Sequence, residues 1–315
     1  KTLFPYTTLF RSPRTSALAV HSAQFSQYVS ATGTPIPNGL TDIWGQAWHV
    51  DGGARLGSSY DRFLQRWFDV PNRWSTFDKP QPKDWALAEI TGLLADVTTV
   101  IRTEDYFNVA KANVVDRWVE IPKKARGIYN GIHKEMIAEL ESGQIVSVDS
   151  GSSRAVKLLQ IAAGFIYYKD EIDPDANQVE FLHDVKLDAI DSILEETGEN
   201  LVVVYFFKAQ LAQLKQRYKD KLRTLDDRGV AQDEWNQGKI KLLAVQYTSA
   251  SMGISLQHGG RNIALLCPTH RQEDAEQIIE RIGPMRQMQS GYNRVVNVFR
   301  IMVRGSTEMS VYRNT

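Results

Sequence analysis

The sequence is short of the features that mark several classes of protein. It has one cysteine, Cys267, among 315 residues, which excludes an internal disulfide framework. The six histidines show no ligand spacing with that cysteine, so we expect no structural zinc site. No run of about 18 apolar residues occurs, which predicts that no segment spans a membrane.

The chain also lacks net charge, because 37 basic residues balance 37 acidic ones. The overall electrostatics therefore give no signal for nucleic acid or a membrane surface, and such a partner would need a local patch. What is present is typical of a globular protein: 43% of the residues are hydrophobic and 23% are charged. The length suggests two domains.

From residue 181 onward, continuous apolar segments alternate with helical patterns. This alternation predicts a parallel sheet covered by helices on both faces, with ligands at the carboxyl ends of its strands. The expected strands are 200–207, 221–226, 241–245, 262–268 and 295–303, and the expected helices are 183–197, 208–218, 232–238 and 272–282. His183 beside Asp184 could form a catalytic pair, but we favour a cap at the start of a helix.

The part before residue 181 is mostly helical in pattern, with helices expected at 84–101, 124–140 and 152–168 and a short strand-like segment at 116–122. One face of the first helix is apolar and is expected in the core; it carries Leu87, Ile90, Leu93, Leu94, Val97 and Ile101. Four tryptophans could stack on nucleic-acid bases, but we assign them to the core because they sit at helical spacing beside other apolar residues. They are Trp44, Trp48, Trp67 and Trp74.

Three loops at strand ends occur in a recognisable order. They are ATGTPIPN at 31–38, TSASMGISLQHGG at 248–260 and QIIERIGPMRQMQ at 277–289. Together they resemble motifs III, V and VI of superfamily-two helicases, most closely the Swi/Snf-type proteins of bacteriophages, and the resemblance runs from about residue 13 to 314. It implies an α/β fold: the end of a first RecA-like lobe at 13–50, a helical insertion and linker at 51–180, and a second, helicase C-terminal RecA-like lobe at 181–315.

The resemblance also implies which residues bind DNA and nucleotide. The serine-rich second loop would touch the nucleic-acid backbone and the nucleotide, with Gly253 letting backbone amides approach phosphate oxygens. On its residues alone, we favour a polar strand-to-helix turn for this loop. The expected nucleotide contacts are Gly253 and Gln277, and the expected DNA contacts are Thr32, Thr34, Lys208, Thr248, Ser249 and Gln257. Lys208 begins a basic run, 208–223, which is also the pattern of a solvated helix face.

Two arginines of the third loop match the positions that stabilise a transferring phosphoryl group in this class of enzyme. The family pattern has two residues between its arginines. This chain has four between Arg281 and Arg286, so the resemblance leaves open which one acts as the arginine finger. A solvated helix end is the alternative reading of both residues.

No G-x-x-x-x-G-K-[ST] string occurs, so the lysine and hydroxyl that would hold ATP phosphates and Mg²⁺ are missing. We expect the chain to be the downstream part of an ATP-dependent DNA helicase or translocase, inactive alone, acting on double-stranded DNA in the cytoplasm of an infected bacterium. A non-enzymatic nucleic-acid-binding or interaction domain is the alternative. Residues 2–12, TLFPYTTLFRS, resemble the translation of a sequencing adapter, and we expect residues 1–12 to be an artefact.

Overall fold

The computed structural model describes residues 21, 25, 27–31, 36, 39–69, 80–101, 109–142, 148–169, 177–226, 228–269 and 271–314. The chain divides into two compact units, Lys1–Arg102 and Thr103–Thr315, called unit 1 and unit 2 below. Three residues singled out in the sequence, Thr32, Thr34 and Trp74, lie outside the described residues, as does the adapter-like segment 1–12.

Unit 1 is built around buried aromatic side chains. Its described elements are the 3₁₀ turn η2 (Leu40–Asp42), helices α2 (Ile43–Asp51), α3 (Tyr60–Trp67) and α4 (Ala86–Leu94), and the antiparallel pair β1 (Phe68–Asp69) and β2 (Gln81–Pro82). Trp44, Trp48 and Trp67 are buried in one cluster with Phe63. The indole of Trp67 donates to Glu89 at 3.0 Å, which provides a partner for its buried N–H. The assignment of these three tryptophans to the core is confirmed.

Helix α4 is shorter than the sequence pattern predicts. Ile90 and Leu94 are buried as expected, but the helix ends at Leu94, and Val97 and Ile101 are exposed at 41% and 71%. Leu87, expected on the same face, is 58% exposed. The segment after the helix, 97–101, is rich in β-branched residues, which lose side-chain freedom in a helix and so favour its end here.

Unit 2 contains a six-stranded sheet in which every neighbouring pair is parallel. The strands lie in the order β3 (Asn113–Val119), β10 (Asn297–Val303), β9 (Asn262–Leu265), β6 (Leu201–Tyr205), β8 (Leu242–Gln246) and β7 (Leu222–Thr224). The predicted parallel α/β sheet is therefore confirmed.

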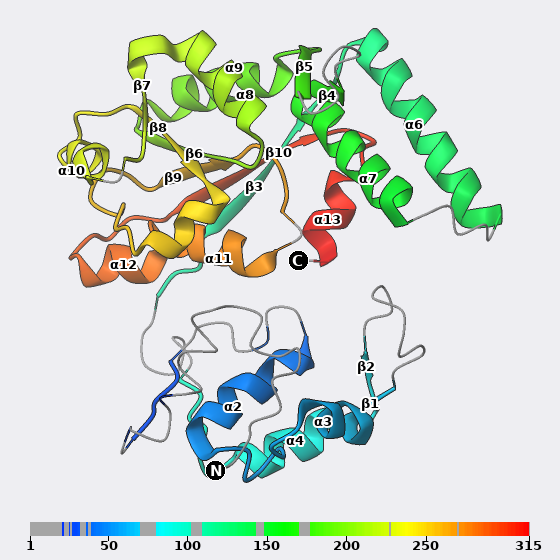
Figure 1. Ribbon diagram of the computed structural model, residues 1–315. Coiled ribbons are helices and arrows are strands. Elements are labelled where there is room, and N and C mark those ends of the chain that lie inside the picture. The colour runs from blue at the N-terminus through cyan, green and yellow to red at the C-terminus, as the bar shows by residue number, and fades with distance from the viewer. Residues whose placement is uncertain are drawn as a thin grey trace. The chain divides into compact units, whose positions relative to one another are not determined.

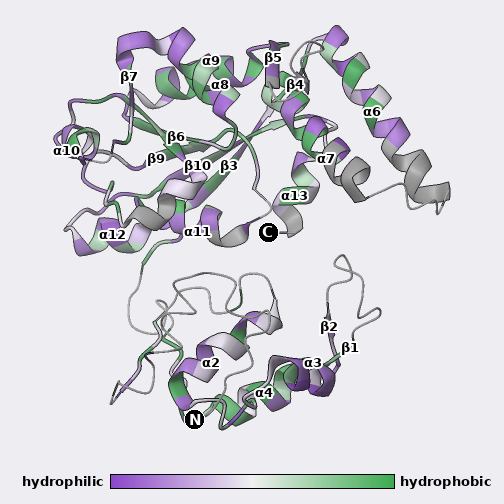
Figure 2. Cartoon of the chain, in the orientation of Figure 1, coloured by the Kyte–Doolittle hydropathy of each residue, from purple (hydrophilic) through white to green (hydrophobic). Residues whose placement is uncertain are grey.

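Helices cover both faces of this sheet (Figure 1). Alternate residues of β6 enter different clusters: Val202 and Val204 pack on the side of α10 (Val230–Asn236) and α11 (Gln272–Glu280). Val203 and Tyr205 pack on the side of α8 (Val185–Thr197) and α9 (Lys208–Tyr218). Because both faces are buried there, the central strands β6, β8 and β9 are mostly apolar, and Figure 2 shows hydrophobic colour along the middle of the sheet.

The edge strand β3 lies in a segment that we expected to be a helical insertion. It pairs along its whole length with β10, with Asn113 opposite Asn297. Helices α6 (Lys123–Ser142) and α7 (Val148–Ala163) then form a pair next to the antiparallel hairpin of β4 (Phe165–Lys169) and β5 (Asn177–Phe181). Their cluster includes Val303 at the end of β10, so these helices belong to the packing of unit 2.

A buried ion pair joins α8 to the last helix, α13 (Glu308–Asn314). The Lys186 ammonium donates to Glu308 Oε1 and to the Leu266 carbonyl, both at 2.6 Å, and the two charged side chains are 3% and 0% exposed. Glu308 Oε2 accepts from the Val303 amide at 2.8 Å. The start of α13 is thereby tied to the ends of β9 and β10.

Lys219 adopts a backbone conformation that favours glycine, with φ 47° and ψ −123° between α9 and the 3₁₀ turn η3 (Lys219–Lys221). We expect Lys219→Gly to raise the free energy of unfolding by about 1 kcal/mol, because a side chain at positive φ carries a steric cost. Urea unfolding would measure it. Lys221→Gly is the matched control and should lower stability, since Lys221 does not have a positive φ. A loss in both variants would contradict strain at Lys219.

Candidate functional site

The carboxyl ends of β6, β8 and β9 meet at one edge of the sheet because these strands are parallel neighbours. Residues 206 and 207 lead from β6 into α9, the 3₁₀ turn η4 (Tyr247–Met252) follows β8, and residues 266–269 follow β9. We call this the carboxyl edge. Open parallel sheets bind their ligands there, which makes it the first place to look for a site.

The turn η4 is anchored to the sheet at its first residue. Tyr247 is 1% exposed and its hydroxyl donates to the Cys267 carbonyl at 2.8 Å. Burial raises the pKa of the Tyr247 hydroxyl, so it stays a neutral donor. Thr248 after it is exposed and Ser249 is half-buried. Two of the expected DNA-contacting residues are therefore at the carboxyl edge, on a turn with a fixed start.

Gly253 ends η4 in the left-handed conformation, with φ 68°. No heavy atom lies within 4 Å of the place that a Cβ would take, so glycine is favoured here by the backbone angle and not by crowding. The residue is exposed. Its role in nucleotide binding stays a prediction.

The two residues in excess of the family pattern start a new helix. Helix α11 ends with Arg281 as its C-cap, and α12 (Pro284–Gln289) begins after Gly283 with proline in its first turn. Arg286 lies on α12, and both arginines are half-buried. Burial lowers the pKa of the Arg281 guanidinium, and the nearby positive charge of Arg286 lowers it further, while Glu280 opposes the shift. The two arginines thus flank the break between α11 and α12.

The segment Ser255–Leu256 contacts both arginine residues. The Arg286 guanidinium donates to the Ser255 hydroxyl at 2.9 Å. The Leu256 amide donates to the Arg281 carbonyl at 2.9 Å. Ser255 lies inside the second sequence loop but was not singled out there, since nothing in the spacing distinguishes it from the other serines of the loop.

The other predicted residues are distributed over two edges of the sheet. Gln277 is one turn before Arg281 on α11 and is half-buried. Lys208 is exposed at the start of α9, at the carboxyl edge. Gln257 is only 8% exposed, precedes the amino end of β9, and its amide nitrogen is 3.2 Å from the Ser290 hydroxyl. A contact between Gln257 and DNA would require that side chain to leave its present partner.

Arg294 is a cation that the sequence reading missed. Its guanidinium donates to Gln287 Oε1 at 2.6 Å and to the Gln257 carbonyl at 2.5 Å, and it stacks 4.0 Å from the centre of the Tyr292 ring. Burial lowers the pKa of this guanidinium. These contacts join α12 to the turn before β9, so Arg294 holds together the elements behind the arginine pair.

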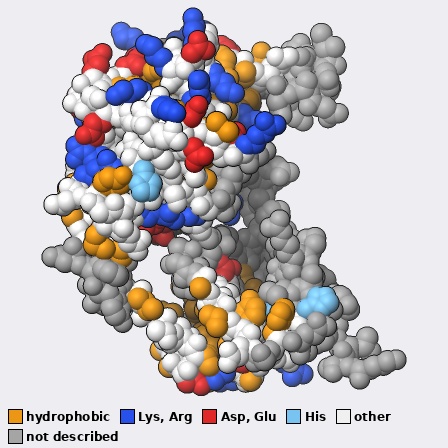
Figure 3. Space-filling view, turned by 90° about the vertical axis from the view of Figure 1, so that its left-hand side faces the viewer, with side chains coloured by type: hydrophobic (Ala, Val, Ile, Leu, Met, Phe, Trp, Pro, Cys, Tyr) orange, Lys and Arg blue, Asp and Glu red, His pale blue; other side chains and the backbone are white. Residues whose placement is uncertain are grey.

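The basic run at 208–223 does not form a purely positive surface. Arg217 pairs with Asp188 and Asp191, and Arg223 lies 3.8 Å from Glu234. Figure 3 shows Lys and Arg side chains mixed with acidic ones over unit 2 in that view. Arg217 and Arg223 therefore have acidic partners on the protein itself, as the solvated-helix-face reading implied.

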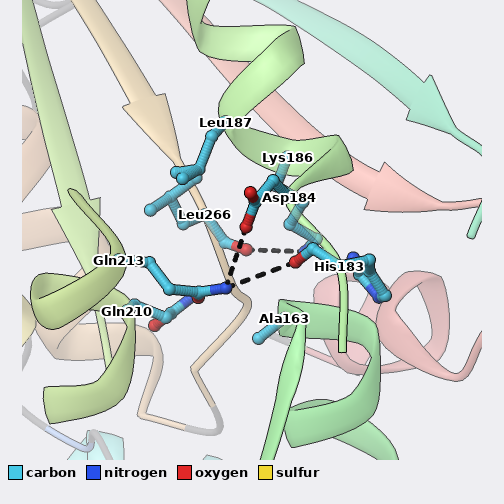
Figure 4. A pocket seen from close by; sticks show the side chains of 8 residues that line it. All are labelled: Ala163, His183, Asp184, Lys186, Leu187, Gln210, Gln213 and Leu266. Carbon is cyan, nitrogen blue, oxygen red and sulfur yellow. Dashed lines mark hydrogen bonds between the residues drawn. The ribbon is translucent and has the colours of Figure 1, made fainter. Parts of the chain in front are cut away.

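A small pocket lies where α7, α8 and α9 meet (Figure 4). Its volume is 10 Å³, about the space of one water molecule. Asp184 is the N-cap residue of α8 but makes no side-chain cap; it accepts instead from Gln213 at 3.4 Å, and His183 Nε2 is 2.9 Å from the Ile161 carbonyl. The pair is thus part of the junction between helices. Within the described ranges, no three His, Cys, Asp or Glu residues are grouped as metal ligands.

Unit 2 has the α/β fold of a RecA-like helicase lobe, with a doubly covered parallel sheet and with η4 and Lys208 at its carboxyl edge. No described helix has the length and apolar character needed to cross a bilayer.

Comparison with known proteins supports this class. No protein-family model matches the chain. It is 38% identical over 303 residues to "Putative protein p41" of Acyrthosiphon pisum secondary endosymbiont phage 1, over 94% of this chain and 63% of that protein. The chain thus spans less than two thirds of the length of this curated relative.

Two solved structures are similar to parts of the chain. The C-terminal part of the Fun30 ATPase domain has a TM-score of 0.52 at 12% identity, over 65% of this chain and 89% of that one. The SWI2/SNF2 ATPase core of Sulfolobus solfataricus in complex with dsDNA has a TM-score of 0.45 at 15% identity, over 90% of this chain and 58% of that one. The Fun30 likeness shows a shared fold, which is the helicase-like fold that the three loops imply.

Proposed function

We propose that this chain supplies the second RecA-like lobe of an ATP-dependent DNA helicase or translocase. The single observation that carries the proposal is the placement of two half-buried arginines, Arg281 and Arg286, both in contact with the segment Ser255–Leu256 that follows η4. A guanidinium stays positively charged and presents paired N–H donors, so a polyphosphate is a ligand that suits both side chains. The p41 relative from a phage and the Fun30 fold agree with this class.

The residues fit ATP phosphates better than they fit Mg²⁺. Guanidinium groups bind phosphate oxygens through paired N–H donors, and two of them can neutralise charge on a transferring phosphoryl group. The described part of the chain groups no three acidic or histidine ligands for a metal ion. We therefore propose that this chain supplies the arginines and that another lobe supplies the P-loop that would hold ATP and Mg²⁺.

DNA is the proposed partner of the exposed face of η4 and the start of α9. Thr248 is exposed and Ser249 half-buried on η4, and Lys208 follows β6 at the same carboxyl edge. Gln210 Oε1 accepts from the amides of Phe206 and Phe207 at 3.0 Å, which fixes the turn just before Lys208. A hydroxyl and an ammonium are suited to phosphate contacts, which fix position without reading sequence. We propose double-stranded DNA.

We expect the chain alone to give no ATP hydrolysis above background. The same chain fused behind a RecA-like lobe that carries a P-loop should hydrolyse ATP, and DNA should raise the rate. A phosphate-release assay with and without duplex DNA measures both. The fused protein with the P-loop lysine replaced by alanine is the control. Hydrolysis by the chain alone, or none by the fused protein, would count against the proposal, and DNA binding without hydrolysis would favour the non-enzymatic alternative.

A further inference from the structure

Three side chains of α10 bind the backbone of Ser255 and Leu256. The Asn236 amide donates to the Ser255 carbonyl at 2.8 Å, and the Ser255 amide donates to Gln232 Oε1 at 3.3 Å. The Trp235 indole donates to the Leu256 carbonyl at 2.8 Å. Consecutive backbone groups of an irregular segment are thus held by one short helix.

The helix that makes these contacts is itself fixed in the core. Trp235 is 0% exposed, and a Cβ on Gly259 would lie 2.5 Å from its Cδ1, so the indole fits directly against that glycine. At the other end of α10, the Asp226 carboxylate accepts from the amides of Val230 and Ala231 at 3.2 and 2.8 Å. These backbone amides hold the pKa of Asp226 below its usual value. Both ends of α10 are therefore anchored.

The segment held by α10 is the same one that contacts the two arginine residues. The Ser255 hydroxyl accepts from Arg286, and the Leu256 amide donates to the Arg281 carbonyl. An arginine side chain has many rotamers, so a fixed acceptor restricts the guanidinium to fewer of them before any phosphate arrives. A serine hydroxyl does this without adding a negative charge that would compete with phosphate.

We infer that Ser255 is a positioning residue for the Arg286 guanidinium, and that α10 supports it through Gln232, Trp235 and Asn236. The inference rests on the proposed function, because Arg286 is one of the two arginines proposed to bind phosphate. It adds that α10, through Ser255, fixes the position of the Arg286 guanidinium. It predicts that losing the Ser255 hydroxyl disorders Arg286 while the fold remains intact.

The test follows the arginine Nε–H signals of the full chain by NMR, with the Arg286 signal assigned by its loss in Arg286→Lys. In the wild type and in Ser255→Thr, which keeps the hydroxyl, we expect an order parameter above about 0.6, and in Ser255→Ala one below about 0.6. Asn236→Ala should also lower it. Gln237→Ala, at an exposed neighbouring position just after α10, is the matched control and should not. An ordered Arg286 in Ser255→Ala, with an unchanged backbone spectrum, would overturn the inference.

A titration with tripolyphosphate separates this inference from the proposed function. We expect Ser255→Ala to bind tripolyphosphate about threefold to tenfold more weakly than the wild type and Ser255→Thr to bind as the wild type does. If Arg286 is ordered by Ser255 but tripolyphosphate shifts neither arginine signal, the proposed function fails and the positioning role stands. If tripolyphosphate binds equally to the wild type and to Ser255→Ala, the positioning role fails for phosphate binding and the proposed site stands.

Discussion

Arg286→Lys should lower kcat for ATP hydrolysis by about 10³-fold in the fused two-lobed protein, with a much smaller effect on ATP binding. An interaction made with charge that develops in the transition state appears in kcat, whereas one made equally with bound ATP appears in KM. Lysine keeps the charge but lacks the planar fork that engages two phosphate oxygens, so it should not rescue the rate. Steady-state kinetics of phosphate release would give both constants.

Arg281→Lys must be measured in parallel, since Arg281 and Arg286 flank Gly283 and Pro284, the extra residues that alter the family spacing. Arg217→Lys is the matched control: this arginine pairs with Asp188 and Asp191 on the outside of α8 and α9 and should leave kcat unchanged. Near-normal turnover in both single variants and in the double variant would rule out an arginine finger in this chain.

Lys186→Met should lower the free energy of unfolding of unit 2 by about 3–5 kcal/mol. The substitution leaves the Glu308 carboxylate, 0% exposed, without its cation in a site from which water is excluded. It also removes the hydrogen bond to the Leu266 carbonyl. Urea unfolding followed by far-ultraviolet circular dichroism would measure the change, with the two units fitted as separate transitions because two-state behaviour holds for single domains.

Two controls test whether burial of the charge is the cause. Lys186→Met combined with Glu308→Leu should recover most of the lost stability, because no uncompensated charge remains. Arg223→Met breaks a pair whose side chains are 51% and 39% exposed, and should cost about 1 kcal/mol or less. A loss in Lys186→Met as small as that in Arg223→Met would contradict the argument.

The strands and helices after residue 181 could be read closely from the sequence. The segment expected as a strand at 200–207 contains β6, and the helix expected at 208–218 is α9 with the same bounds. Both faces of the sheet are covered, so the central strands β6, β8 and β9 are short and mostly apolar runs, and the intervening helices have one apolar face. Such signals depend only on neighbouring residues, so they can be read from the sequence without knowledge of the fold.

Helix ends and edge pairing were harder to predict. The apolar pattern of α4 continues to Ile101, but the helix ends at Leu94 because β-branched residues follow. Strand β3 was expected only as a short strand-like segment at 116–122 in an insertion, and it pairs with β10 near the other end of the chain. A local sequence pattern does not indicate which distant strand a segment will pair with.

For the candidate site, the sequence placed Arg281, Arg286 and the serine-rich loop in order, but it left open whether the arginines were a solvated helix end. Their half-burial comes from the packing of α11 and α12. The spacing of residues in the sequence likewise does not predict the hydrogen bond between Arg286 and Ser255, or the one between Asn236 of α10 and Ser255.

The sequence by itself determined the class of the fold, the order of the loops and the kinds of side chain that they carry, because periodicity, turn residues and composition act within a few neighbouring residues. Only the tertiary structure decided that β3 completes the sheet, that Lys186 forms an ion pair with Glu308, and that the Ser255 hydroxyl accepts a hydrogen bond from Arg286. Each of these depends on bringing distant segments into contact at hydrogen-bonding distance, and that is set by the packing of the whole unit and not by the residues on either side.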